Sequence, residues 1–372
     1  MKITDVEVLI LRSDNLNENI ADGSQEACII KVHTDEGITG LGEVDSVPTI
    51  VKAIVEAPSS HSVSHGLKKL VVGEDPFEVE KIWEKMYQGT MYHGRRAAVI
   101  HAISGIDMAL WDIMGKAVNK PVYKLLGGGF RKKIRAYASL LMPEKVAEVK
   151  RVTTSYVEQG YTAVKLGWGP LGQDEKNDVR LVAAAREAIG DDVDLMIDAG
   201  LCYNVNSAIR MGKKFEEFNL FWFEEPCWAD NFDHYARISE AVNIPIAAGE
   251  QEATRYSFKE LIERGKIDIV QPDISRCGGI TEARKIGIIA QMNNIPLVPH
   301  VFSTGILTAA SLHVVASIPN AMIIEFCRSE SPLNRNLLTN PFDIKDGYLD
   351  IPEGPGLGVE LNEEVVQKYL VK

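Results

Sequence analysis

Alternating apolar and polar positions mark the N-terminal part of the chain, up to about residue 57, as a small antiparallel β unit. Segments 2–11 and 27–33 alternate as half-buried strands do, and residues 35–37 (DEG) form a turn signal before the return segment ITGLGEV. The polar stretch 14–25 between the first two strands is long for a hairpin loop, so it is a candidate lid. Specificity is expected from this loop and from a second capping loop, residues 44–60.

Residues 76–118 have helical spacing. Pro76 can open a helix at its first turn, and the apolar residues that recur at helical spacing are Ile103, Ile106, Leu110, Ile113 and Met114. Together with the β unit, this pattern predicts an α+β capping domain over residues 1–125.

From residue 134 onward, short apolar runs alternate with amphipathic stretches such as 176–189 and 281–293. The runs expected to be strands are 134–139, 161–167, 193–198, 220–224, 245–249, 267–271, 296–300 and 321–325. Eight strands with seven intervening helices predict an α/β (TIM-type) modified barrel over residues 126–327, with a last helix that is short or displaced. The turn-rich tail, residues 328–372, is expected to pack back on the capping domain.

Six successive predicted strands end in a chemically active side chain. Asp198, Glu224 and Glu250 follow one another at steps of 26 residues, and the series continues with Asp273, His300 and Glu325. Because the C-terminal ends of parallel barrel strands meet at one mouth, these six groups should share a pocket.

Three carboxylates without a neighbouring Cys or His form a hard oxygen-donor set, which favours Mg²⁺ over Zn²⁺. The simpler alternative for any single acid is a helix N-cap or a solvated strand end. Three acids in register with a His and a second Asp make this alternative much weaker.

Length, charge and cysteine content exclude several classes of protein. The chain of 372 residues exceeds a minimal barrel of about 250 by enough for one further domain. Its net charge of −12 has the wrong sign for a nucleic-acid binder, and its five cysteines show no CxxC spacing. No run of 18 or more apolar residues occurs, and the N-terminus does not look like a signal peptide, so we expect no membrane association and a cytoplasmic location.

The order of motifs along the chain resembles the enolase superfamily, and within it the acid-sugar dehydratases of the mandelate racemase subgroup. The motifs are GITGLGE, ALWDIMGKAVNKPVYKLLGG, AVK, MIDAG, FEEP, AAGE, QPDISRCGG and VPH, and they cover essentially the whole chain. The resemblance implies a Mg²⁺ ion that stabilises an ene-diolate, a small-molecule acid substrate and association into a homo-oligomer.

The resemblance also implies roles for individual residues. Asp198, Glu224 and Glu250 would be the metal ligands, whereas Asp273 and His300 would form the base dyad. Lys165 and Glu325 would contact the substrate carboxylate, with Ser139 as a further substrate-binding residue. We expect Glu325 to be protonated, because burial beside other carboxylates favours the neutral acid that can donate a hydrogen bond. Glu225, which follows the second ligand, is a less certain member of the site.

Two positions depart from the pattern of this subgroup. Racemases carry Lys-x-Lys on the second barrel strand, but this chain has Gly167 in the second position, so the base for the opposite face is missing. Some dehydratases carry a His two residues after the first metal ligand, where this chain has Gly200. Trp168 either fills the vacated space or packs its loop.

A site with one dyad favours a lyase that removes the C2 proton of an aldonate and eliminates the 3-hydroxyl. Because the seventh-strand His of the subgroup addresses (R)-configured acids, the resemblance implies a 2R substrate. Two alternatives are kept: an isomerase (racemase, epimerase or cycloisomerase) that uses the same intermediate, and a metal-binding barrel without chemistry.

Overall fold

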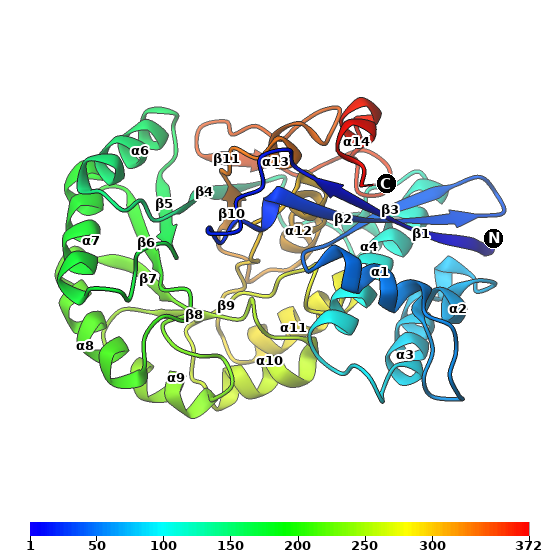
Figure 1. The fold of residues 1–372 in the computed structure, drawn as a ribbon, viewed down its shortest axis with the longest axis horizontal. Helices are drawn as coiled ribbons and strands as arrows, with labels where there is room; N and C mark the ends of the chain where they lie inside the picture. Colours follow the sequence, from blue (N-terminus) through cyan, green and yellow to red (C-terminus); the bar gives the residue numbers. More distant parts are fainter. Residues whose placement is uncertain (372) are drawn as a thin grey trace.

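An antiparallel sheet opens the fold of this computed structural model, which describes residues 1–371. Its strands, in the order β1-β2-β3, are β1 (Ile3–Arg12), β2 (Glu26–Thr34) and β3 (Thr39–Val44). Five helices follow: α1 (Pro48–Glu56), α2 (Leu67–Val71), α3 (Val79–Gly89), α4 (Ala98–Ala117) and α5 (Val122–Leu125). Of these, α1, α2 and α4 contact the sheet (Figure 1). These elements form the predicted α+β cap.

Two glycines allow β3 to lie directly on α4. A Cβ atom on Gly42 would lie 1.9 Å from the carbonyl oxygen of Gly105, and one on Gly40 would lie 2.1 Å from that of Ala109. By length and composition α4 could cross a membrane, but 89% of its most apolar window is buried inside the protein, as in the core helix of a globular domain.

One expectation for the cap was wrong, and the structure adds detail to another. Segment 44–60, expected as a loop, contains α1, which has Pro48 in its first turn and buries Val51 and Val55 one turn apart. The helical region 76–118 is divided into α3 and α4 by residues 90–97, where Ala97 has a positive φ of 52° that ends helical continuity.

The second part of the chain is a barrel of parallel strands covered by helices on the outside (Figure 1). Its elements are β4 (Lys133–Leu141), α6 (Val146–Glu158), β5 (Ala163–Gly167), α7 (Glu175–Ile189), β6 (Asp194–Asp198), α8 (Val205–Phe215), β7 (Leu220–Glu224), α9 (Phe232–Ser239), β8 (Ile246–Ala248), α10 (Thr254–Glu263), β9 (Ile269–Val270), α11 (Gly279–Met292), α12 (Gly305–Ser317) and β10 (Ile324–Cys327).

The seventh barrel strand, expected over residues 296–300, is reduced to isolated bridges. Leu297 pairs with Val270 on one side and with Ala321 on the other, and His300 pairs with Asp273. Pro296 and Pro299 have no N–H to donate, which explains why no continuous ladder forms here. β10 pairs with β4 on the far side, so the barrel closes.

One apolar residue from each barrel strand fills the interior below the site. These eight residues are Tyr137, Ala163, Met196, Trp222, Ala247, Ile269, Val298 and Ile323. Successive side chains of a strand point to opposite faces, so the residue two positions later points inward again, one layer higher. That upper layer contains Ser139, Lys165, Asp198, Glu224, Gln271, His300 and Glu325.

The tail after β10 contacts both parts of the molecule. β10 is followed by the five-residue helix α13 (Pro332–Asn336), which is the short last helix that the pattern predicts. β11 (Tyr348–Asp350) pairs antiparallel with β4, and α14 (Glu363–Tyr369) lies near β1, where Val371 N–H donates to the carbonyl oxygen of Ile10 at 2.9 Å. The tail therefore connects the capping sheet to the first barrel strand.

Candidate active site

The upper layer of the barrel faces a cavity of about 580 Å³, a size typical of small-ligand sites. The barrel contributes its polar floor, including Ser139, Lys165, Asp198, His300 and Glu325. The cap covers the other side with residues 16–18, 20–23 and 25 of the candidate lid loop, and with Glu26, Asp45 and His101. Two domains therefore enclose one site.

Asp198, Glu224 and Glu250 converge as the spacing predicts. One ligand oxygen from each lies within 4.8 Å of the others, and all three residues are buried. Burial raises the pKa of Asp198 well above its ordinary value, and burial also raises the pKa of Glu224. Neighbouring acids raise both pKa values further. Such a cluster is unfavourable without a compensating cation.

The donor set fits a hard divalent cation. Oε2 of Glu250 is buried and makes no hydrogen bond, although it lies 3.2 Å from Nε2 of His300. Oε2 of Glu224, in contrast, accepts hydrogen bonds from Trp222 Nε1 at 2.7 Å and Gln271 Nε2 at 2.9 Å, which fix the orientation of the carboxylate. Three buried carboxylates, with Glu224 fixed in orientation and a free oxygen on Glu250, match the ligand preference of Mg²⁺.

Lys165 lies at the centre of the floor. Its Nζ is 2.5 Å from Glu224 Oε1, 2.8 Å from Glu325 Oε1 and 3.8 Å from Asp198 Oδ2. Burial favours the neutral amine, but Glu224 and Glu325 raise the pKa of Lys165 well above its ordinary value. The side chain is therefore a fixed cation.

Glu325 differs from the expectation that it is protonated. Burial alone would raise its pKa, but the charges of Lys165 and His300 outweigh burial and lower it below the ordinary value. Oε1 also accepts from Ser139 Oγ at 2.6 Å, and Oε2 accepts from Val301 N–H at 2.6 Å. With donors at both oxygens, Glu325 is a carboxylate that holds Lys165 and Ser139 in place.

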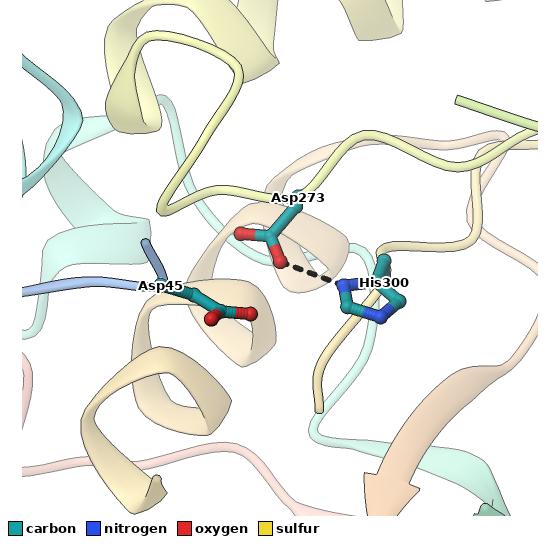
Figure 2. Close-up of side chains that lie close together, drawn as sticks. All are labelled: Asp45, Asp273 and His300. Carbon is teal, nitrogen blue, oxygen red and sulfur yellow. Dashed lines mark hydrogen bonds and ion pairs between the residues drawn. The ribbon is translucent and has the colours of Figure 1, made fainter. Parts of the chain in front are cut away.

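His300 and Asp273 form a hydrogen-bonded pair, with 2.7 Å between Nδ1 and Oδ2 (Figure 2). Burial disfavours the Asp273 carboxylate, but the hydrogen bond from His300 and the charge of Arg276 lower its pKa below the ordinary value. A carboxylate can only accept, so Nδ1 carries the proton of this pair, and Nε2 on the other side of the ring lies 3.2 Å from Oε2 of Glu250.

The two glycines that depart from the subgroup pattern are enclosed by neighbouring side chains. A Cβ atom on Gly167 would lie 2.5 Å from the Cβ of Asp198, and one on Gly200 would lie 2.6 Å from Cδ2 of Trp168. Neither position can carry a side chain without displacing its neighbour. Trp168 covers Gly200, the position at which some dehydratases carry a histidine, and it also lines the cavity.

Glu225 is not one of the three grouped carboxylates and is held by hydrogen bonds of its own. Tyr235 OH donates to its Oε2 at 2.8 Å and Gly249 N–H donates to its Oε1 at 2.9 Å. Burial raises its pKa to about 8, with a further contribution from Glu250. These contacts give the side chain a supporting position beside the cluster.

Several residues of the site were not identified from the sequence. Gln271 could have been found, because it follows the interior residue Ile269 at the strand period. Asp45, Ser275 and Arg276 carry no such signal. Asp45 reaches the site from the cap, and its contacts with Ser275 and Arg276 join residues far apart in the sequence. Its carboxylate lies 2.6 Å from Arg276 Nη2.

Residues 147–365 match the family described as Enolase C-terminal domain-like, and residues 19–127 match the mandelate racemase / muconate lactonizing enzyme N-terminal domain. The chain belongs to the mandelate racemase subgroup of the enolase superfamily. This assignment accounts for the cap, the modified barrel and the row of acids at its strand ends.

Relatives of known structure or curated name cover almost the whole chain. A D-galactarolactone cycloisomerase of Agrobacterium fabrum is 36% identical over 92% of this chain and 90% of its own. An arabinonate dehydratase of Saccharolobus solfataricus is 34% identical over 95% and 93% of the two chains. The crystal structure of the 3,6-anhydro-D-galactonate cycloisomerase from Zobellia galactanivorans superposes with a TM-score of 0.90, at 34% identity over the full length of both chains.

Proposed function

We propose that this protein is a Mg²⁺-dependent dehydratase of an aldonate, a sugar acid with one carboxylate. The observation that carries the proposal is the single His300–Asp273 pair, 2.7 Å apart, in the same cavity as Lys165 and the carboxylate cluster. Relatives named arabinonate, D-xylonate and D-galactonate dehydratase support the class of reaction.

Removal of a proton beside a carboxylate places a second negative charge on the substrate, and the site must offset it. Asp198, Glu224 and Glu250 would hold Mg²⁺, which supplies a Lewis acid for the substrate carboxylate. Lys165 faces the same charge, and Glu325 together with Glu224 keeps its Nζ in position. Ser139 is held beside them by Glu325.

His300 acts twice in this mechanism. Its Nε2 takes the C2 proton, the C2–C3 double bond forms and the C3–O bond breaks. The imidazolium then gives its proton to the departing hydroxyl, which leaves as water, and the enol becomes a 2-keto-3-deoxy acid. Because one ring serves both steps, the elimination is syn.

Cycloisomerisation is the second candidate, and the names of two similar proteins favour it. If the leaving oxygen belongs to a ring of the substrate, the same proton removal and elimination open the ring without releasing water. Racemisation fits less well, because it requires a base on the opposite face, where Gly167 abuts Asp198.

A panel of aldonates, lactones and anhydro acids, incubated with the Mg²⁺-loaded enzyme, tests these candidates. Semicarbazide detects the 2-keto product, and mass spectrometry shows whether the mass of one water is lost. We expect loss of water from at least one aldonate, and a fall of about 10²- to 10⁴-fold in both turnover and C2 deuterium exchange in His300→Asn. A keto product of unchanged mass would identify the cycloisomerase, and exchange with inversion would identify the epimerase.

A further inference from the structure

Asp45 places a cap carboxylate beside the base pair of the barrel. It follows β3, is 9% exposed, and its carboxylate points toward Asp273 and His300 (Figure 2). One ligand atom from each of these three residues lies within 4.8 Å of the others. Resting on the proposed function, we infer that Asp45 is a positioning residue, through which the cap orients the dyad.

A first chain of hydrogen bonds runs from the cap backbone to Asp273. Asp45 N–H donates to Ser275 Oγ at 3.2 Å, and Ser275 Oγ donates to Asp273 Oδ1 at 2.6 Å. The backbone N–H of Ser275 donates to the same oxygen, also at 2.6 Å. Oδ1 is thereby fully engaged, which leaves Oδ2 directed at His300.

A second connection runs through Arg276. Its Nη2 lies 2.6 Å from Asp45 Oδ2, and its Nε donates to the carbonyl oxygen of Asp45 at 3.2 Å. The same guanidinium is 3.8 Å from Asp273 Oδ2, the oxygen that accepts the hydrogen bond of His300. Asp45 therefore holds Arg276 away from the acceptor that His300 needs.

A bound cation is a poorer explanation for this group of three residues. Arg276 occupies Asp45 Oδ2, Ser275 occupies Asp273 Oδ1, and His300 occupies Asp273 Oδ2. A metal would have to displace a buried guanidinium that already supplies the positive charge. The contacts therefore favour a hydrogen-bonded support for the dyad.

The consequence of losing the Asp45 carboxylate follows from these contacts. Arg276 would keep its contacts with the Asp45 carbonyl oxygen and with Glu250 Oε1 at 3.5 Å. Without the ion pair, however, its guanidinium could turn toward Asp273 Oδ2, compete with His300 and turn the imidazole away from the substrate. Misplacement of a reacting group by about 1 Å can cost about 10²-fold in rate. Removing the guanidinium as well should restore part of the lost rate.

The test compares Asp45→Asn, the double variant Asp45→Asn/Arg276→Met, and Glu84→Gln in the Mg²⁺-loaded full-length protein. Glu84→Gln is the matched control, because Glu84 of α3 forms a different ion pair between cap and barrel, 3.0 Å from Arg255 of α10. The measurements are kcat and KM on the best acid, and the downfield proton resonance of His300 Nδ1–H, assigned by its loss in His300→Asn.

We expect Asp45→Asn to lower kcat by about 10²-fold, with KM within about threefold, and to shift or broaden the His300 resonance. The double variant should regain part of kcat and part of the wild-type His300 resonance. Glu84→Gln should change neither kcat nor the resonance. An unchanged resonance in Asp45→Asn, or an equal loss in Glu84→Gln, would overturn the inference. The resonance needs no substrate, so a wild-type protein that is inactive on every acid contradicts the proposed function alone.

Discussion

Gly167 and Asp198 are in such close contact that a Cβ atom at position 167 would lie 2.5 Å from the Cβ of Asp198 and 2.8 Å from its carbonyl oxygen. Even a methyl group there must displace a residue of the carboxylate cluster. The absent second base is thus linked to the geometry of the proposed metal site.

Gly167→Ala should therefore weaken Mg²⁺ binding by at least about tenfold, since loss of ligand orientation typically costs this much. Isothermal titration calorimetry measures the effect. Gly287→Ala on α11 is the control, because a Cβ atom there would lie at an ordinary contact distance of 3.4 Å from its nearest neighbour. The affinity of this control variant for Mg²⁺ should be unchanged. Equal affinity in Gly167→Ala would show that the cluster tolerates the displacement.

Removal of the metal should abolish turnover and lower the melting temperature, because the three buried carboxylates then carry more negative charge than the neighbouring Lys165 offsets. Thermal unfolding with EDTA and with excess Mg²⁺ measures the difference. Asp198→Asn should lose most of the Mg²⁺-dependent shift. Full activity after complete chelation would contradict the proposed mechanism.

The stability of the metal-free protein should depend on the charge of His300. Burial opposes protonation, but Glu250 and Glu325 outweigh it and raise the pKa of His300 to about 10. Because the unfolded chain holds this proton less tightly, the stabilisation is complete below about pH 6.5 and is lost as the pH rises through about 10.

Urea unfolding of the metal-free wild type and of His300→Asn tests this dependence. The difference in their free energies of unfolding should shrink between about pH 6 and pH 10. A difference that grows with pH would mean that the folded state favours the neutral ring.

The face of the substrate that His300 addresses predicts the configuration at C2, because the opposite face has Gly167 in place of a base. With His300 as the sole base, we expect acids of 2R configuration to react and their C2 epimers to be inert. Keto-acid release from epimeric pairs of five- and six-carbon aldonates measures the preference. Consistent turnover of the 2S members would identify Lys165, or another residue, as the base.

The strand period made much of this site predictable. Asp198 and Glu224 lie two residues after the interior residues Met196 and Trp222, and Glu250 follows the end of β8, so the three acids meet at the mouth where the parallel strands end. The charge of Glu325 was not predictable, because it depends on the 2.8 Å separation from Lys165 Nζ. Asp45 was missed for a similar reason: its contact with Arg276 joins residues 231 positions apart.

Glu43, the last-but-one residue of β3, is completely buried and accepts four hydrogen bonds at the start of α12. The donors are Ser303 Oγ, Thr304 N–H, Thr304 Oγ1 and Leu307 N–H, at 2.7 to 3.1 Å. A helix of the barrel thus receives its N-terminal hydrogen-bond acceptor from the cap. Chimaeras that exchange caps between relatives to transfer specificity must therefore keep Glu43, because it supplies this acceptor to α12.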